Sequence, residues 1–229
     1  LKKLYELCEF SAKVFHPLKV GRVIARPFLG DNSGTFFRTK NRKDYTFPPP
    51  NKTLCDLVIE NNRSCHAIGK IADIFSNRGI STSVSGLSDD ALFYKMIDVI
   101  KKAKNGDLIF ANFVEFDSLY GHRRDVAGFA AALERFDLKL VKLLEVINPN
   151  DFLIITADHG NDPTFKGTDH TREKVPVLMV GNYAQKGNNG NIVFSDVGAT
   201  MADFLDLSGK LKGTNIFYDN NKLEKKCKT

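Results

Sequence analysis

Residues 108–116, LIFANFVEF, form a nearly uninterrupted apolar run that ends in the polar segment FDSLYGHRRD at residues 116–125. A continuous apolar run, rather than an alternating one, is typical of a strand that is covered on both faces. Residues 151–157, DFLIITA, and residues 175–181, VPVLMVG, have the same character. The sequence therefore predicts a buried strand at each of these three places.

Helical patterns lie before, between and after these runs. The spacing of apolar residues predicts helices at residues 53–61, 89–103, 126–147 and 197–205, and a further short strand at residues 64–69. Thr53 is a suitable cap for the first of these helices, and Asn148 followed by Pro149 ends the third. Because strands alternate with helices, we expect an α/β fold with a mainly parallel sheet and helices on both faces.

The clearest break in the chain is the segment TFPPPNKT at residues 46–53. Three successive prolines fit neither a helix nor a central strand. Before the break, residues 4–15 have helical spacing and residues 20–28, VGRVIARPF, predict a short strand. We therefore expect two parts, a small α+β piece at residues 1–47 and a larger α/β part at residues 48–229.

The composition excludes several classes of protein. Of the 229 residues, 42% are apolar and 26% are charged, as in ordinary globular chains. No apolar run reaches the ~18 residues of a membrane span. The net charge of +6 suits the binding of anions, but the chain lacks the aromatic and basic motif of an RNA-binding module. The four cysteines lack CxxC spacing, which indicates reduced thiols in a cytoplasmic protein.

Acidic and imidazole side chains gather where two predicted strands end. They are Asp117 and His122 after the strand at 108–116, and Asp158, His159 and His170 after the strand at 151–157. Ligands bind at the carboxyl ends of strands in open α/β sheets, so neighbouring parallel strands would bring both groups together. Carboxylates and imidazoles suit divalent cations. The adjacent pair Asp158 and His159 favours two ions ~3.5–4 Å apart, an arrangement that serves phosphoryl transfer.

The other reading of an Asp-His pair after a strand is a helix cap or an ordinary loop contact. The presence of two such groups favours the metal site. His16 and His66 have no acidic neighbours in the sequence, and we expect both to be structural.

Five segments resemble blocks of the phosphopentomutase family, within the alkaline phosphatase superfamily, and occur in the family's order. They are GRVIARPF, RTKNRKDY, IGKIADIF, FDSLYGHRRD and ITADHGNDPTFKGTDHTRE, between residues 21 and 173. The resemblance implies an alkaline phosphatase-like core at residues 48–229 and the C-terminal part of a cap domain at residues 1–47. It also implies an isomerase that moves a phosphoryl group between the 1- and 5-positions of ribose or deoxyribose in nucleoside catabolism. Such an enzyme uses two Mn²⁺ ions and a phosphorylated threonine.

The resemblance also implies roles for individual residues. Asp117, His122 and His170 are similar to the ligands of one Mn²⁺, and Asp158 and His159 to two ligands of the other. Three further residues resemble the family's contacts with the pentose phosphate substrate, namely Arg22, Ile24 and Lys70. Further charge partners are expected among Arg26, Arg38, Arg123 and Arg172.

The resemblance covers roughly the C-terminal three-fifths of such an enzyme. The nucleophilic threonine and a further metal-binding aspartate are expected upstream, so no catalytic residue is assigned in this chain. We expect the chain alone to bind Mn²⁺ without turning over pentose phosphate. Two alternatives stay open: another phosphomutase or phosphoesterase of the superfamily, and a non-catalytic metal-binding fragment that docks to a partner chain. The sequence leaves open Mn²⁺ against Mg²⁺ or Zn²⁺, the preferred sugar and the oligomeric state.

Overall fold

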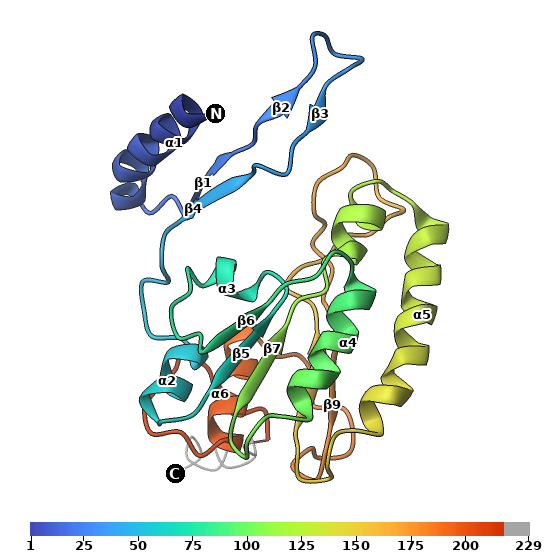
Figure 1. The fold of residues 1–229 in the computed structure, drawn as a ribbon. Helices are drawn as coiled ribbons and strands as arrows, with labels where there is room; N and C mark the ends of the chain where they lie inside the picture. Colours follow the sequence, from blue (N-terminus) through green and yellow to red (C-terminus); the bar gives the residue numbers. More distant parts are fainter. Residues whose placement is uncertain (218–229) are drawn as a thin grey trace, which may run out of the picture.

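The computed structural model describes residues 1–217 (Figure 1). Its helices are α1 (Lys2–Phe15), α2 (Leu54–Glu60), α3 (Ile71–Ile74), α4 (Asp89–Ile100), α5 (Val126–Leu144) and α6 (Phe194–Phe204), with a 3-10 turn at His16–Leu18 and a π-helical turn at Phe116–Gly121. Its strands are β1 (Arg22–Ala25), β2 (Phe28–Leu29), β3 (Phe37–Arg38), β4 (Lys43–Thr46), β5 (Cys65–Ile68), β6 (Thr82–Val84), β7 (Leu108–Ala111), β8 (Leu153–Thr156) and β9 (Val177–Val180).

A three-stranded parallel sheet forms the centre of the larger part. Its order is β6-β5-β7, and Ile68 at the end of β5 pairs with Val84 and Ala111 at the ends of its neighbours. All three strands therefore finish at the same edge. The chain segments that leave this edge, after residues 68, 84 and 111, begin close to one another.

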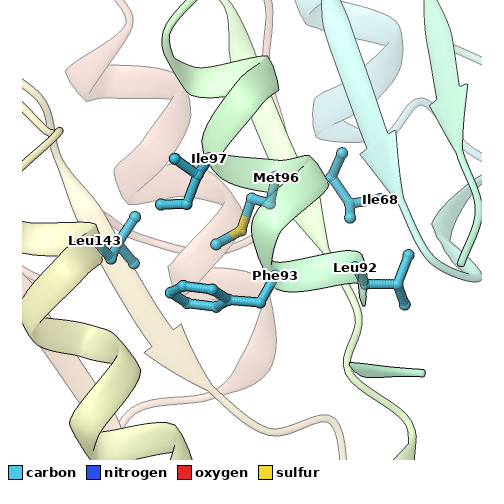
Figure 2. Close-up of a cluster of buried hydrophobic side chains, with 6 residues drawn as sticks. All are labelled: Ile68, Leu92, Phe93, Met96, Ile97 and Leu143. Atoms are coloured by element: carbon cyan, nitrogen blue, oxygen red, sulfur yellow. The ribbon is translucent and has the colours of Figure 1, made fainter. Parts of the chain in front are cut away.

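Helices cover both faces of this sheet (Figure 1). Successive strand residues point to opposite faces, so Ile68 faces α4 and α5 whereas Cys65 faces α2 and α6. Figure 2 shows the first cluster, which joins Ile68 to Leu92, Phe93, Met96 and Ile97 of α4 and Leu143 of α5. The second cluster contains Cys55, Val58, Cys65, Leu108 and Leu205. The predicted α/β class, with a parallel sheet and helices on both faces, is confirmed.

Strands β8 and β9 form a separate antiparallel pair, with Leu153 opposite Val180. Within residues 1–217, β8 makes no ladder with β7, so our expectation that these two strands are neighbours in one sheet was wrong. Strands occur at both predicted places, but our expectation that each is covered on both faces was wrong, because β8 is only half-buried and Leu178 and Val180 of β9 are exposed. Hydrophobicity alone also does not specify which strand pairs with which. The polar segments that follow β7 and β8 still meet, through side chains described below.

The segment before the prolines packs largely on itself. Helix α1 lies against β1 and β4, which pair antiparallel, and β2 and β3 form a second antiparallel pair beyond them (Figure 1). Ser76 donates a hydrogen bond to Thr46 (2.6 Å). Arg78 holds the proline segment, because its guanidinium donates to the carbonyls of Pro49 and Asn51 and to the Asp56 carboxylate. The division at residue 47 stays a prediction.

The cysteines of the described residues form no disulfide. Cys8, Cys55 and Cys65 are free thiols, as expected, and Cys227 lies outside the described residues. The hydrogen bond with Cys55, together with burial, raises the pKa of the Cys65 thiol.

Across residues 1–217, no helix has both the length and the apolar character that crossing a membrane requires.

Candidate metal centre

The segment after β7 is built to present Asp117 and His122 together. The amide of His122 donates to the carbonyl of Asp117 (2.9 Å), so a single wide turn closes between them. Turns of this π type are frequent at functional sites. The turn places His122 Nε2 3.4 Å from Asp117 Oδ2. A spacing of five residues in the sequence thus becomes a pair of neighbouring side chains.

The start of this turn is fixed by the N-terminus of α4. The carboxylate of Asp89 accepts hydrogen bonds from the amides of Val114 (3.0 Å) and Glu115 (2.9 Å). The Glu115 carboxylate accepts one in return from the Asp89 amide (3.2 Å). Burial raises the pKa of Asp89, and the nearby Glu115 charge raises it further. These reciprocal bonds end β7 early and direct the chain into the turn that carries Asp117.

The long loop after β8 brings the remaining candidates to the same place. His170 Nε2 lies 3.2 Å from Asp117 Oδ1. The ring of His170 stacks between two others, at centroid distances of 4.9 Å from His122 and 3.6 Å from His159. Potential ligand atoms of Asp117, His159 and His170 all lie within 4.8 Å of one another. Two segments more than 30 residues apart therefore converge on one carboxylate.

Hydrogen bonds to the other ring nitrogens show that this cluster fits a divalent cation. His122 Nδ1 contacts the carbonyl of Thr168 (2.5 Å), and His159 Nδ1 contacts the carbonyl of Gly160 (3.2 Å). A carbonyl only accepts, so each Nδ1 carries a proton and Nε2 is the ring nitrogen left to bind a metal. The Nε2 atoms of His122 and His170 lie beside the Asp117 carboxylate, which is itself a ligand that divalent cations prefer. A cation is the natural partner for such a set of donor atoms.

Asp158 is the most exposed of the predicted ligands. Its side chain is 72% accessible, and its Oδ1 lies 3.7 Å from His159 Nε2. The group of Asp117, His159 and His170 does not include it. Asp158 and His159 thus form a pair that is joined to the others through the His159 ring.

The predicted substrate residues lie in two places. Lys70 lies two residues after the end of β5, at the sheet edge from which the Asp117 segment also departs, and its side chain is exposed. Arg22 and Ile24 lie on β1, where Arg22 pairs with Asp44 (3.4 Å) and Ile24 is half-buried. Arg42 binds the same carboxylate, and this hydrogen bond lowers the pKa of Asp44. No hydrogen bond or ion pair of the described residues links Arg22 or Ile24 to the histidine cluster.

Two residues of the site were not predicted from the sequence. Asn161 donates to Asp117 Oδ1 (2.7 Å), and Arg124 donates to Asn161 Oδ1 (2.8 Å). Both occur inside the motifs GHRRD and ADHGND. Because amides and guanidinium groups are common on protein surfaces, their residue type gave no signal of a role beside the ligands.

Several known proteins are similar to this chain in sequence. The chain is 46% identical over 217 residues to a phosphopentomutase of Agrobacterium fabrum, covering 94% of this chain and 53% of that protein. It is 49% identical over 212 residues to a phosphopentomutase of Legionella pneumophila strain Corby, covering 92% and 52%. A phosphopentomutase of Chelativorans is 48% identical, with 94% and 53% covered. The chain thus spans about half the length of the curated relatives it matches.

A solved structure and a family model place the fold. The structure of the PH0037 protein from Pyrococcus horikoshii superposes with a TM-score of 0.56 at 15% identity, covering 90% of this chain and 64% of that one, which shows a shared fold. The model of the metalloenzyme superfamily matches residues 59–209, a span that contains all five predicted metal ligands. The chain therefore belongs to the metalloenzyme superfamily.

Proposed function

We propose that this chain forms the metal-binding part of a phosphopentomutase, which interconverts the 1-phosphate and 5-phosphate of ribose or deoxyribose. The observation that carries the proposal is the position of Asp117, whose two oxygens lie 3.2 and 3.4 Å from His170 and His122. Similarity to phosphopentomutases at 46–49% identity over more than nine-tenths of the chain supports the choice of reaction.

Two Mn²⁺ ions are the proposed cofactors. Asp117, His122 and His170 would hold one of them, and Asp158 and His159 would contribute to the other. Bound metal would neutralise charge on the phosphoryl oxygens as the group is transferred. The Nδ1 atoms of His122 and His159 donate to the carbonyls of Thr168 and Gly160, which leaves Nε2 as the ring nitrogen for a metal and fixes the direction in which it points.

Cationic side chains would bind the sugar phosphate. Lys70 is proposed as a phosphate contact because it lies at the edge of the sheet where the Asp117 segment begins. Arg22, with Ile24 beside it, would approach from the segment before the prolines, which we propose to be part of a cap domain. The Arg22 side chain is 48% exposed beside Asp44, so part of its guanidinium surface remains available to a phosphate.

The phosphoryl carrier is proposed to lie outside these 229 residues. The resemblance implies a phosphorylated threonine and a further aspartate ligand upstream of the matching segments, and the chain spans only about half of its relatives' length. We propose that a segment of a longer protein supplies both, and that the complete enzyme acts on pentose phosphates from nucleoside catabolism in the cytoplasm. The cysteine spacing, which contains no CxxC pair, supports that compartment.

A chimeric enzyme tests this proposal. The segment of the Legionella pneumophila relative that matches this chain would be replaced by residues 1–217. We expect Mn²⁺-dependent conversion of ribose 5-phosphate to ribose 1-phosphate, followed by chromatography of the two sugars. Asp117→Asn should abolish conversion, whereas Asp98→Asn, an exposed carboxylate on α4, should leave it unchanged.

The choice of substrates separates the alternatives. The same chimera would be offered a phosphoglycerate and an aryl phosphomonoester. Faster turnover of either one than of ribose 5-phosphate would replace the proposed reaction with another of the superfamily. A folded chimera that binds Mn²⁺ but converts none of the three would favour a purely metal-binding role.

A further inference from the structure

The guanidinium of Arg124 joins the two segments that carry the metal ligands. It comes from the segment after the π-helical turn, and its donors reach into the loop after β8. The acceptors are five oxygens: the carbonyls of Gly121 (3.0 Å), Asp162 (2.8 Å), Gly167 and Asp169 (2.6 Å), and Asn161 Oδ1 (2.8 Å). None of these oxygens belongs to a carboxylate, so the guanidinium is used as a hydrogen-bonding frame rather than as one half of an ion pair.

One branch of this frame ends on a predicted metal ligand. Arg124 Nη1 donates to Asn161 Oδ1 (2.8 Å), and Asn161 Nδ2 donates to Asp117 Oδ1 (2.7 Å). A guanidinium only donates and a carboxylate only accepts, so the Asn161 amide fits in one orientation alone. Arg124 therefore sets the orientation of the amide that holds the Asp117 carboxylate. We call this chain of contacts the Arg124–Asn161 relay.

The other branch holds the backbone that precedes His170. Arg124 donates hydrogen bonds to the carbonyls of Gly167 and Asp169, and His122 Nδ1 donates to the carbonyl of Thr168 between them. Three successive carbonyls are thus bound from the segment after β7. Between residues 157 and 176 the loop has one isolated backbone bridge, from Gly160 to Thr171, and no helix or strand. Its shape depends on contacts such as these.

The local backbone is adapted to this arrangement. Arg124 has a φ of +55°, a conformation that costs free energy for any residue with a Cβ. Gly121 is buried, and a Cβ at this position would lie 2.5 Å from Asn161 Nδ2. The absence of a side chain at Gly121 therefore allows the Asn161 amide to reach Asp117. The backbone thus accepts strain at Arg124 and has no side chain at Gly121, and both features accompany the contact between Asn161 and Asp117.

We propose that Arg124 is a positioning residue of the metal centre. It acts on Asp117 through Asn161 and on His170 through the carbonyls of residues 167 and 169, and it makes no contact with the ion itself. The proposal rests on the proposed metal-binding function. Groups that orient metal ligands in this way typically change metal affinity ~10–100-fold when they are removed.

The test compares two neighbouring arginines in the 229-residue chain. Arg124→Gly removes the guanidinium and tolerates the positive φ. Arg123→Gly removes the exposed side chain next to it, which is expected to face the substrate phosphate and is a control for metal affinity only, not for activity. The Mn²⁺ dissociation constant would be measured by titration calorimetry, with circular dichroism as a check of folding. We expect ~10–100-fold weaker binding for Arg124→Gly and a wild-type value for Arg123→Gly. Asn161→Leu, which has a similar size, should weaken binding as Arg124→Gly does.

Chemical rescue separates positioning from general stability. Millimolar guanidinium ion should restore Mn²⁺ affinity to Arg124→Gly, because the cavity and the acceptor oxygens remain, but should not restore Asn161→Leu. In metal-free protein, trypsin should also cleave after Lys166 faster in Arg124→Gly than in Arg123→Gly. Equal affinities for both glycine variants and for Asn161→Leu would overturn the relay while leaving the metal centre in place. A wild-type chain that does not bind Mn²⁺ would overturn the proposed function itself.

Discussion

At the scale of single residues, Asp107 shows how one carboxylate organises a region away from the metal centre. It accepts hydrogen bonds from the amides of Ser64 (3.0 Å) and Lys104 (2.8 Å), and from His66 Nε2 (3.2 Å). Burial by itself would raise the pKa of Asp107, but these hydrogen bonds outweigh burial, so the pKa is lowered. The same group therefore connects the start of β5 to the turn before β7.

Asp107 predicts a dependence of stability on pH. Because its pKa is lower in the folded state than in the unfolded chain, the ionised group stabilises the fold above about pH 3.9, and this contribution is lost as the pH falls through the folded pKa. Asp107→Asn should cost about 1.5–3 kcal/mol at pH 7 and flatten the acid limb of the stability curve. Urea unfolding at several pH values measures both. If the variant and Asp98→Asn give curves parallel to the wild type, Asp107 has no such role.

Gly69 predicts a cost that comes from two separable sources. Its φ is +75°, and a Cβ would collide with the carbonyl of Asn112 on the neighbouring segment. Gly190 has nearly the same φ, +74°, but open space around it. Gly190→Ala should therefore cost about 1–2 kcal/mol from backbone strain alone, and Gly69→Ala more. Equal unfolding free energies for the two variants would show that the close approach to Asn112 is unimportant.

At this scale, the sequence pointed to the side chains that converge better than to the groups that hold them. Asp117 and His170 were recognisable because few other side chains bind metals. Arg124 and Asn161 were missed because a hydrogen-bond relay depends on direction, which residue type does not reveal. His66 was expected to be structural because it has no acidic neighbour in the sequence. In the structure its acidic partner is Asp107, which lies 41 residues away in the sequence and therefore could not be recognised from the residues next to His66.

At the scale of elements, α4 is the helix on which the first core cluster depends. Phe93 is 1% exposed and packs near Phe113 and Phe136, at ring distances of 6.3 and 6.5 Å. Its neighbour Tyr94 is 48% exposed. Phe93→Ala should cost about 3–5 kcal/mol, and Tyr94→Ala far less, in urea unfolding. A similar loss from both would mean that α4 is not anchored through Phe93.

Elements with a repeated pattern, a recognisable cap or a continuous apolar run were predicted from the sequence, whereas α3 and β6 were not. Thr53 caps α2 as expected, since its hydroxyl accepts from the Asp56 amide (3.3 Å). Helix α3 has four residues and β6 has three, too few to show a period. The predicted strand at 108–116 ends at Ala111 because the amides of Val114 and Glu115 bond to Asp89 instead of a neighbouring strand. Side chains distant in sequence thus set where an element stops.

At the scale of the whole molecule, Mn²⁺ should behave as a stabilising ligand. A ligand at 100 times its dissociation constant adds about 2.7 kcal/mol, which raises the melting temperature of a chain of this size by roughly 5–11 °C. Thermal denaturation with and without Mn²⁺ measures the shift. Asp117→Asn should lose most of it and Asp98→Asn none. An unchanged melting temperature for the wild type would contradict the metal centre.

The arrangement of the sheets was the least predictable feature at this scale. The apolar runs that became β7 and β8 have the same character, yet they lie in different sheets. Strand pairing depends on the geometry of the connecting helices, and a run of apolar residues does not indicate which strand it will pair with. The segments after β7 and β8 nevertheless come together as expected. Side-chain contacts, including those of Arg124, hold them together in place of strand pairing.

Cys55 and Cys65 are completely buried, and their reactivity can report how often this part of the fold opens. Cys55 on α2 and Cys65 on β5 are both 0% exposed and share one cluster, so a thiol reagent reaches them only when helix and strand separate. The rate at which an alkylating agent modifies these two sulfurs therefore reports how often that contact opens. Peptide mapping would identify which thiol has reacted, and this opening could be followed without adding any probe to the molecule.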